Sequence, residues 1–295
     1  MFKNMKLRNK IMLPICLVVL IIFSASMGFI VSRMSNISEK DAKIRADEIA
    51  NRYSNLMKGE LENGFNAARA LALVFEGIKE SKAQPQRDTL DNMLQNVLAE
   101  NKYLMGIWTC WEPNALDGKD DEFKGTKGHD STGRYIPYWN RAGGQIQVEP
   151  LSGYQKQGVG NYYQIPKNTG QETILEPYKY EVGGRNVLMT NMSVPVKVEG
   201  EVLWVVEVDI LFKKKKKKIA NIKPYGNGYV FLISESGQLV AHPKVDVLGE
   251  DIANYVKEGQ ELVNHVANAE VFTFMKKAEG GEKTDSYFEV VPFSL

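Results

Sequence analysis

The pattern of hydrophobic positions changes three times along the chain, and it begins with a continuous apolar run near the amino end. Residues 11–31 contain no charged side chain. As a helix at about 1.5 Å per residue this run would be about 31 Å long, enough to cross a bilayer. Four basic residues precede the run and no acidic residue occurs before Glu39. The positive-inside rule therefore places Met1 in the cytoplasm and the rest of the chain outside the membrane.

A cleaved signal peptide is the competing interpretation of this run. The small residues Ser24-Ala25-Ser26 would suit a cleavage site. The uncharged stretch is, however, longer than the apolar core of a signal peptide, which is about 7–15 residues. We therefore favour an uncleaved anchor in the inner (plasma) membrane, with the folded part on the periplasmic or extracellular side.

Helical periodicity follows from residue 35 to residue 80. Apolar side chains recur there at intervals of three and four, the spacing of one helix face. They are Ala46, Ile49, Ala50, Tyr53, Leu56, Met57, Leu61, Phe65, Ala68, Leu71, Ala72 and Phe75. Such a helix is roughly 65 Å long at about 1.5 Å per residue, so part of it is expected to form a stalk. Its apolar stripe could pack on the folded domain, on the same helix of a second subunit, or on both.

Apolar runs of strand length, separated by Gly, Pro and Asn, then dominate residues 133–211. This pattern is typical of a multi-stranded antiparallel sheet. A second helix over 87–100 and an aromatic strand over 103–111 precede it. The polar, Gly-rich segment 112–133 is expected to form a long loop.

A second, smaller sheet unit is predicted after residue 227. Residues 228–242 read as a hairpin, and a helix is expected near 251–266. Strands are expected at 271–275 and 286–291 around a Gly280-Gly281 turn. The pattern ends at Leu295 without further closing strands, so we expect a fragment or a truncated form.

Together these patterns predict an α+β fold with an N-terminal transmembrane helix, a long stalk helix and two antiparallel-sheet modules in tandem. The expected divisions are 1–10 for a cytoplasmic N-terminus, 11–31 for the transmembrane helix, 35–80 for the long helix, 81–211 for a membrane-distal ligand-binding module, 212–226 for a linker and 227–295 for an incomplete membrane-proximal module.

Composition narrows the function classes. The 295 residues carry a formal net charge of +1, which offers no broad attraction to nucleic acid. The two cysteines, Cys16 and Cys110, have neither the number of a disulfide framework nor the spacing of a metal site. No nucleophile elbow, zinc-protease motif, phosphate loop or dinucleotide fingerprint is present. With three scattered histidines, the chain is not expected to be an enzyme, and no cofactor is expected.

Two charge clusters have alternative interpretations. Asp117, Asp120, Asp121 and Glu122 could suggest calcium, but they lack EF-hand spacing, so we favour a solvated loop without a metal. The six lysines of Lys213–Lys218 could bind nucleic acid or anionic lipid, but an exposed helix face is the favoured reading.

A series of short motifs accompanies this order of elements. They are Gly133-Arg-Tyr-Ile-Pro-Tyr-Trp139, Tyr162-Tyr-Gln-Ile-Pro-Lys167, Glu176-Pro-Tyr178, Val206-Glu-Val-Asp209, Lys223-Pro-Tyr-Gly-Asn-Gly-Tyr229 and Gly237-Gln-Leu-Val-Ala-His-Pro243. In their order and spacing the chain resembles, over residues 5–295, the extracytoplasmic half of bacterial chemoreceptors (methyl-accepting chemotaxis proteins) that carry a double Cache sensor domain. The resemblance implies two PAS-like modules, of which the membrane-distal one usually binds the ligand.

The chain departs from the amino-acid-sensing members of that family. Those members carry an Arg-x-Trp-Tyr cluster, a later Tyr-x-Asp and an Asp at the end of a strand. Asp209 matches the last element. Tyr138-Trp139 stand in the place of Trp-Tyr, Arg134 lies further upstream, and Tyr178-Lys179-Tyr180 lacks the Asp. A standard amino-acid ligand is therefore in doubt.

Asp209 is the leading candidate for a ligand contact. It ends an apolar strand, where a buried and unpaired carboxylate is costly, and a ligand's ammonium group would offset that cost. Its alternative roles are a helix cap or a partner for the adjacent lysines. Tyr138, Trp139, Tyr163 and Tyr178 could wall in a cationic or planar ligand, or they could be ordinary core.

An arginine completes the candidate set. Arg134 could grip a carboxylate with both nitrogens, or it could lie at the surface. The candidate ligand-binding residues are Asp209, Tyr138, Trp139, Tyr178, Tyr163, Arg134 and Tyr180.

The expected function is extracytoplasmic sensing of a small polar ligand (an amine, an amino acid or a related metabolite) in bacterial chemotaxis. The expected partners are that ligand, the membrane and a second copy of the chain; a kinase and a coupling protein would bind a cytoplasmic region absent from these residues. The alternatives are the sensor region of a membrane histidine kinase or diguanylate cyclase and, in another class, a membrane-anchored structural or adhesion protein.

Overall fold

The computed structural model describes most of the chain. The described residues are 6–81, 86–182, 185–211, 219, 222–226, 228–244, 247–277 and 286–295, with the side chains of 9–10 and 179–187 left out. The predicted Lys213–Lys218 run, most of the predicted linker and the predicted Gly280-Gly281 turn lie outside the described residues.

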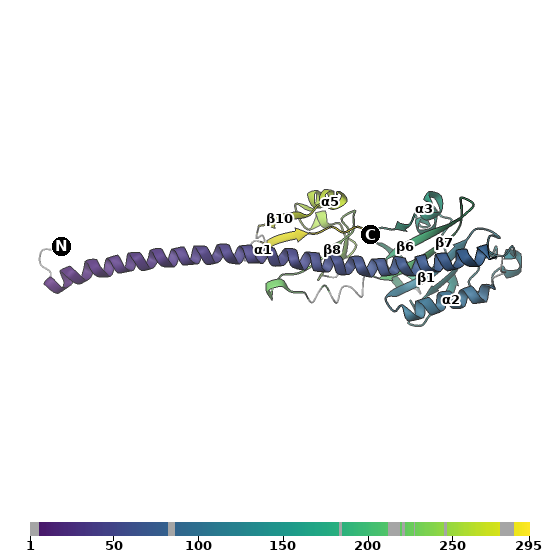
Figure 1. Ribbon diagram of the computed structural model, residues 1–295, viewed down its shortest axis with the longest axis horizontal. Coiled ribbons are helices and arrows are strands. Elements are labelled where there is room, and N and C mark those ends of the chain that lie inside the picture. The colour runs from purple at the N-terminus through teal and green to yellow at the C-terminus, as the bar shows by residue number, and fades with distance from the viewer. Residues whose placement is uncertain are drawn as a thin grey trace.

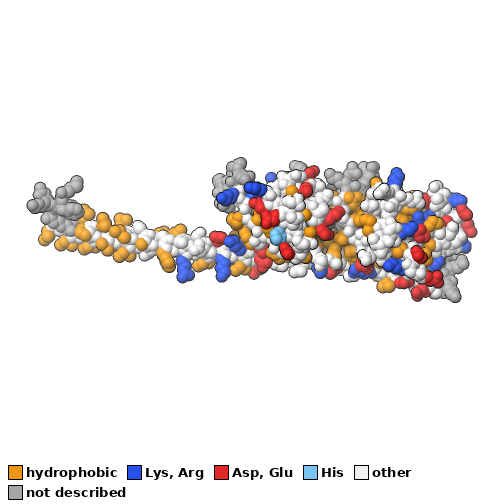
Figure 2. Space-filling view, turned by 90° about the horizontal axis from the view of Figure 1, so that it is seen from above, with side chains coloured by type: hydrophobic (Ala, Val, Ile, Leu, Met, Phe, Trp, Pro, Cys, Tyr) orange, Lys and Arg blue, Asp and Glu red, His pale blue; other side chains and the backbone are white. Residues whose placement is uncertain are grey.

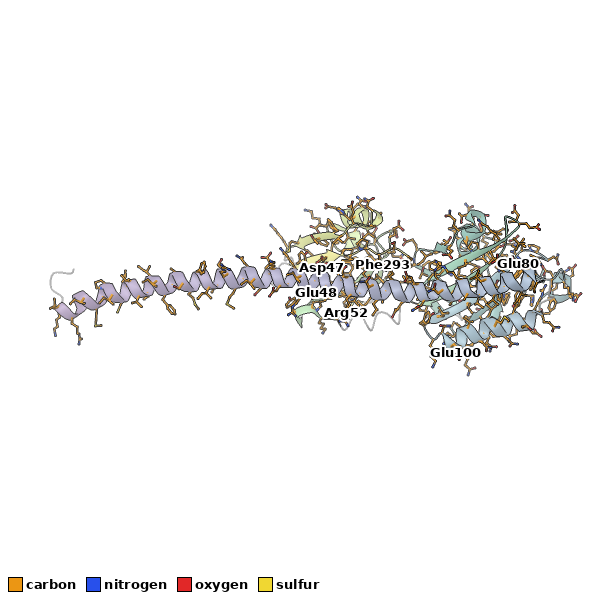
Figure 3. All side chains as sticks on the ribbon, in the orientation of Figure 1. Asp47, Glu48, Arg52, Glu80, Glu100 and Phe293 are labelled. Carbon is orange, nitrogen blue, oxygen red and sulfur yellow. The ribbon has the colours of Figure 1, made fainter. Side chains whose placement is uncertain are left out.

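One helix, α1 (Leu7–Glu80, 74 residues), runs through both parts of the molecule. It joins the predicted transmembrane and stalk segments without a break (Figure 1). Its amino-terminal part is exposed, long enough and apolar enough to cross a membrane. Hydrophobic side chains surround that part in Figure 2, and lysines and arginines follow them. Two modules lie along the other half of the helix. The proximal module already contacts it at Asp41, whose carbonyl accepts from the Tyr225 hydroxyl at 3.2 Å, shortly before the labelled Asp47, Glu48 and Arg52 (Figure 3).

The membrane-distal module is built on a seven-stranded sheet of order β3-β2-β1-β7-β6-β4, with β5 paired to β6. All of its strand pairs are antiparallel. The strands are β1 (Leu104–Trp111), β2 (Pro137–Asn140), β3 (Gln147–Pro150), β4 (Thr173–Ile174), β5 (Tyr178–Val182), β6 (Arg185–Val198) and β7 (Glu201–Leu211). The fold is therefore α+β, as the sequence predicts.

A tight turn sets the register of the two longest strands. Glu199 and Gly200, between β6 and β7, both have positive φ (53° and 91°), as a two-residue hairpin of this hand requires. This turn, with one bulge at Val196/Lys197, places Asn191 of β6 opposite Asp209 of β7.

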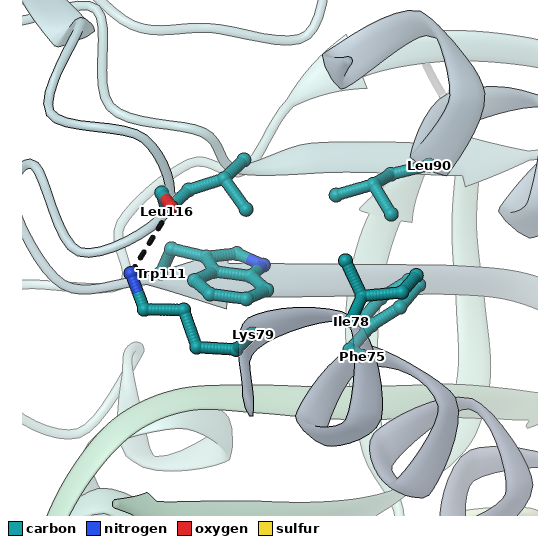
Figure 4. A pocket seen from close by; sticks show the side chains of 6 residues that line it. All are labelled: Phe75, Ile78, Lys79, Leu90, Trp111 and Leu116. Atoms are coloured by element: carbon teal, nitrogen blue, oxygen red, sulfur yellow. Dashed lines mark hydrogen bonds between the residues drawn. The ribbon is translucent and has the colours of Figure 1, made fainter. Parts of the chain in front are cut away.

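Two helices cover one face of this sheet. α1 and α2 (Arg87–Glu100) bury their apolar faces there, and α2 contributes Leu90, Leu94 and Leu98 at four-residue spacing. Trp111 and Trp204 stack beneath α1 with ring centroids 4.1 Å apart. At the end of α1, Lys79 donates to the Leu116 carbonyl at 3.1 Å and ties the 112–133 segment to the helix (Figure 4). The apolar stripe of α1 was expected to pack on the folded domain, on a second subunit, or on both. The structure shows that its residues pack on the chain's own modules.

The opposite face carries a short helix where a strand was expected. Residues Asn161–Thr169 form α3, although we had assigned this aromatic run to the sheet. The helix ends at Gly170, which adopts the left-handed conformation (φ 62°) that favours glycine. A four-residue 3-10 helix, η2 (Asp120–Phe123), lies in the predicted loop.

The membrane-proximal module contains two separate hairpins. Its elements are η3 (Pro224–Gly226), β8 (Leu232–Ile233), β9 (Leu239–Ala241), η4 (Ile252–Asn254), α5 (Gly259–Ala267), β10 (Phe272–Lys276) and β11 (Ser286–Val290). β8 pairs with β9 and β10 with β11. A largely apolar core packs between them, with Phe274 and Phe288 stacked at 4.8 Å. The two modules and α1 together line an apolar groove of about 930 Å³.

Candidate functional site

The candidate site is built from two cross-strand rows on the sheet face that α1 does not cover. In the first row Gly106 of β1, Asp209 of β7 and Asn191 of β6 are register partners. In the next row Trp108, Glu207 and Ser193 are partners in the same way. Because side chains two apart on a strand share a face, the two carboxyl groups point to the same side. α3 closes this side, where Tyr162 packs edge-on against Trp108 at 5.3 Å.

The polar groups of these rows are buried and bonded to one another. Glu207, Asp209 and Asn191 are only 0%, 1% and 2% exposed. The Asn191 amide nitrogen donates to Asp209 Oδ1 at 2.7 Å and also to Glu207 Oε1. Trp108 Nε1 donates to Glu207 Oε1 at 2.8 Å. The Ser193 hydroxyl contacts Glu207 Oε2 and lies 3.1 Å from the Tyr162 carbonyl.

Burial shifts the acidity of both carboxyl groups. It raises the pKa of Asp209 to about 7, while hydrogen bonding from Tyr138 and Glu207 lowers that pKa and limits the rise. Burial, followed by the negative charge of Asp209, raises the pKa of Glu207 well above its ordinary value. Both shifts arise because water is replaced by protein around a charge.

Two acceptor atoms of the cluster lack a full hydrogen bond. Asn191 Oδ1 is buried and accepts no hydrogen bond from the residues described. Asp209 Oδ2 is also buried; the Tyr138 hydroxyl approaches this carboxyl group, but not in a standard hydrogen-bond geometry. Within the described ranges, neither Asp209 nor Glu207 forms an ion pair, and three or more metal-binding side chains nowhere gather. Buried acceptors without donors are costly, so the arrangement suits a ligand that brings N–H donors.

Gly106 makes room for the aromatic wall of the site. A methyl group at this position would lie 2.4 Å from Tyr138 Cε2 and 2.6 Å from Asp209 Oδ2. The Tyr138 side chain therefore occupies the space above Gly106 and reaches Asp209. Tyr178 stands one row further on the same face, because it pairs with Met189, which pairs with Leu211. Asp209, Tyr138 and Tyr178 thus share one face, and of the two tyrosines Tyr138 is the one placed against Asp209.

Trp139 is placed on the other face of the sheet. Neighbouring strand residues alternate, and Trp139 packs among the core residues under α1 and α2. Its indole nitrogen donates to Asp91 of α2 at 3.2 Å. The structure therefore separates Trp139 from Asp209. The side chain of Tyr180 lies outside the described residues.

Arg134 and Tyr163 belong to a second buried network. Arg134 is 4% exposed, so the surface role is excluded. Its guanidinium donates to Glu112 at 2.9 Å and to the Tyr163 hydroxyl, and Lys167 pairs with the same Glu112 oxygen at 2.7 Å. Arg134 also lies over the Tyr154 ring at 5.0 Å. This network ties α3 to the end of β1 and already occupies the guanidinium.

The acidic loop, which was expected to be solvated, is held by a buried arginine. Arg87 of α2 pairs with Asp117 at 2.6 Å and Asp120 at 2.7 Å, and it donates to the Gly133 carbonyl at 2.8 Å. Phe123 packs on its guanidinium at 4.2 Å. The loop is thus fastened by a buried arginine rather than solvated throughout, and these two carboxylates share the single positive charge of Arg87.

Sequence reasoning missed Glu207, Asn191 and Ser193. A signal was present, because Glu207 lies two residues before Asp209 in the strand and must share its face. Asn191 and Ser193 show the same two-residue spacing in β6, but their pairing with β7 depends on the register of the hairpin.

Comparisons with known proteins agree with this architecture. Residues 90–217 match the family "Methyl-accepting chemotaxis protein-like, first PDC sensor domain". The chain is 31% identical over 183 residues to the methyl-accepting chemotaxis protein TlpQ of Pseudomonas aeruginosa, which covers 57% of this chain and 26% of TlpQ. The chain spans between 13% and 26% of the length of the curated relatives that it matches.

Solved structures extend the likeness to both modules. The extracellular domain of mmHK1S-Z3, assigned as a histidine kinase, has a TM-score of 0.72 and 30% identity, covering 80% of this chain and 84% of that domain. A structure of a methyl-accepting chemotaxis protein X has a TM-score of 0.68 and 26% identity, covering 89% and 94%. Residues 90–217 therefore form a PDC sensor domain of the methyl-accepting chemotaxis protein-like family, and the chain as a whole is similar to the extracellular sensor domains of such receptors and of histidine kinases.

Proposed function

We propose that the membrane-distal module binds a small ligand bearing a protonated amine, and that the Asp209 carboxylate forms an ion pair with this ammonium group. The observation that carries this proposal is the buried Asp209 carboxyl group, which pairs with no cation among the residues described and stands beside Asn191 Oδ1, a buried acceptor without a donor. An ammonium group has three N–H donors and no acceptor. It would donate to Asn191 Oδ1 and to the Asp209 carboxylate, and it would offset the cost of burying that carboxylate.

Aromatic rings would complete the site. Tyr138 and Tyr178 share the face of Asp209 and would contact the carbon atoms of the ligand. Arg134 and Tyr163 would set the position of α3 over the site, and Trp139 would hold β2 against α2. Domains of this fold are known in complex with amino acids, namely 4-methylisoleucine in Tlp3 of Campylobacter jejuni and asparagine in Mlp24. Both compounds are small and carry an amine.

The chain would act as the outer, sensing part of a chemotaxis receptor. The exposed apolar part of α1 would cross the inner membrane with residues 1–10 in the cytoplasm, and both modules would lie in the periplasm. A ligand in the distal module would alter the packing along α1, and a homodimer would transmit the change. The kinase and the coupling protein would act on a cytoplasmic region. We expect no enzymatic activity.

A histidine-kinase sensor is the second candidate. It is favoured by the 30% identity to the extracellular domain of mmHK1S-Z3. The ligand site would be the same, and only the output would differ. Fusing residues 1–295 to the cytoplasmic half of a chemoreceptor and to that of a histidine kinase would test which output responds to the ligand.

A thermal-unfolding screen of the full chain in nanodiscs tests the ligand class. The compounds are amines, amino acids, organic acids and purines. We expect stabilisation by compounds with an ammonium group and none by organic acids, because the site offers acceptors and negative charge. The stabilisation should be lost in Asp209→Asn and kept in Asp121→Asn, whose carboxylate is exposed. Stabilisation by organic acids alone would contradict the proposal.

A further inference from the structure

We propose that Glu176 is a coupling residue, which carries ligand binding in the distal module to the membrane-proximal module through its contact with Ser236. This inference rests on the proposed function and adds to it a route beside the one along α1. Its physical basis is a chain of hydrogen bonds that starts at Asn191, in the candidate site, and ends in the core of the proximal module.

The segment of residues 175–177, between β4 and β5, is fastened to the strand that carries part of the site. The Leu175 amide donates to the Asn191 carbonyl at 3.2 Å, and the Thr190 hydroxyl donates to the Leu175 carbonyl at 2.6 Å. The Leu175 side chain packs on the site's side of the sheet. Because the Asn191 side chain bonds to Asp209, a ligand that displaces Asn191 also displaces Leu175.

The backbone around Glu176 is stiff. Pro177 has a fixed φ and restricts the residue before it to extended conformations, and Pro177 is itself buried. A short segment with restricted dihedral angles moves as one piece and does not absorb a displacement within itself. The movement of Leu175 therefore reaches the Glu176 carboxylate, which belongs to the next residue.

This carboxylate holds the tip of the β8–β9 hairpin, residues 234–237. One oxygen of Glu176 accepts from the Ser236 hydroxyl at 2.8 Å, and the other accepts from the Ser236 amide at 3.2 Å. Hydrogen bonds to an ionised carboxylate are stronger than those between neutral groups. The two bonds join positions that are 60 residues apart in sequence, so they link the distal module directly to the proximal one.

The hairpin tip is fixed in turn to the core of the proximal module. The amide of Ile252, a buried core residue, donates to the Gly237 carbonyl at 2.9 Å. Gly237 has positive φ (88°), and a methyl group at this position would lie 2.4 Å from Val263 of α5. The tip thus packs directly on α5, and a movement of Ser236 is passed to that helix.

Hydrogen–deuterium exchange of the full chain in nanodiscs tests this route from the proximal side, without a ligand. Ser236→Ala removes one of the two bonds to Glu176 and, being distant in sequence, leaves the intrinsic exchange rate of the Leu175 amide unchanged. We expect the Leu175 amide to exchange at least about threefold faster in Ser236→Ala than in the wild type, near the lower end of the effect of one lost hydrogen bond. An unchanged rate at Leu175 would overturn the inference.

The probe for the route from the ligand site is n-butylamine. At saturation it should change the exchange rates of residues 232–241 in the wild type by about fivefold or more, the lower end of typical coupling between sites. Glu176→Ala should abolish this response. Because coupling is reciprocal, calorimetry should show that Glu176→Ala still binds n-butylamine, with an affinity changed by no more than a similar factor. Glu172→Ala is the matched control and should keep the response, because Glu172 pairs with Arg69 of α1 and not with the proximal module.

A proximal response that persists in Glu176→Ala, or that Glu172→Ala also abolishes, would overturn the inference. Binding of n-butylamine to the wild type without any change in residues 232–241 would overturn it too. Failure of n-butylamine to bind would count against the proposed function, whereas the exchange of the Leu175 amide in Ser236→Ala decides the inference separately. Circular dichroism should show that Glu176→Ala is folded, because the replaced side chain is exposed.

Discussion

Gly106 shows how one absent side chain shapes the site. Because this position carries no Cβ, the ring of Tyr138 crosses β1 and lies against Asp209. The ring shields the carboxylate from water, and this burial contributes to the raised pKa of Asp209. A residue without chemistry of its own thus controls the electrostatics of its neighbour.

Gly106→Ala should therefore disturb the site more than the fold of the rest of the module. The added methyl group would lie within 2.9 Å of three atoms of Tyr138 and Asp209, so the ring must move. We expect a loss of about 1–3 kcal/mol in the free energy of unfolding, measured by urea titration. Amine binding should weaken as well. An unchanged affinity would show that Tyr138 does not wall the site.

The pH dependence of stability should reveal Asp209. Its folded pKa, about 7, lies above its unfolded value of about 3.9. Between these values the folded chain keeps a proton that the unfolded chain has lost. The free energy of unfolding should therefore fall as pH rises from about 4 to about 7, by up to roughly 1.4 kcal/mol for each pH unit, relative to Asp209→Asn. Parallel curves for the two proteins would contradict the shift.

Only some of the candidate ligand-binding residues predicted from the sequence lie on one face of the sheet, and the reason is the alternation of side chains along a strand. Asp209, Tyr138 and Tyr178 come to one face, but adjacent strand residues cannot share a face. Tyr138 and Trp139 could therefore not both wall one pocket, and strand alternation alone would have excluded one of them. Arg134 was expected to meet a ligand or the surface, and its true partners are set by tertiary contacts that no local pattern encodes.

At the scale of elements, a buried arginine fastens the 112–133 loop to α2. Arg87→Met would leave Asp117 and Asp120 buried without their cation. We expect a loss of about 3–5 kcal/mol in the free energy of unfolding, measured by urea titration. Arg69→Met is the matched control, because the Arg69–Glu172 pair is about 40% exposed and should contribute only about 0–1 kcal/mol. Equal losses in the two variants would refute this account of the loop.

The helices and strands that were predicted correctly have a strong periodicity of apolar residues. The elements that were missed have residues that are compatible with both helix and strand. α1, α2 and the long strands β1, β6 and β7 follow from the spacing of apolar residues, whereas the exposed edge strand β3 shows no such pattern. The run that forms α3 lies within the stretch predicted to be sheet, and its tyrosines and isoleucine have high β propensity. Its aromatic face instead packs on the sheet, so tertiary contacts decided its conformation. The order of the strands depends on long-range pairing and could not be read from sequence.

At the scale of the whole molecule, α1 is the element that both modules share. Its apolar stripe faces the chain's own modules, as the 4% exposure of Met57 shows. A different set of apolar side chains remains exposed, including Ile37 and Ile44, seven residues apart. This spacing is that of a helix pair, so the proposed homodimer would use this face rather than the buried stripe.

Cysteine crosslinking in membranes tests that assignment. Cysteine at Ile37 or Ile44 should form a disulfide between two copies, because these side chains face outward. Cysteine at Met57 should not, because this position is covered by the chain itself. Crosslinking that is equal at all three positions, or confined to Met57, would contradict the proposed dimer face.

The overall organisation of the chain could be predicted from the sequence, but the contacts between its parts could not. The apolar amino-terminal run, the long helix and two sheet units are visible as apolar patterns. The link between the modules is not: the Glu176 carboxylate accepts from the Ser236 hydroxyl at 2.8 Å and from its amide at 3.2 Å. These two residues are distant in sequence, and only the folded chain brings them together.

The central claim is that a buried carboxylate at Asp209 receives a ligand's ammonium group. Calorimetry with the amine that stabilises the full chain most, at about pH 6 and pH 8, tests it most directly. The affinity of the wild type should rise with pH, because the bound amine displaces the proton of Asp209. Asp209→Asn should bind about 10 to 150 times more weakly at pH 8, for a loss of about 1.5–3 kcal/mol, and Asp121→Asn should match the wild type. Equal affinities for the wild type and Asp209→Asn at both pH values would contradict the account.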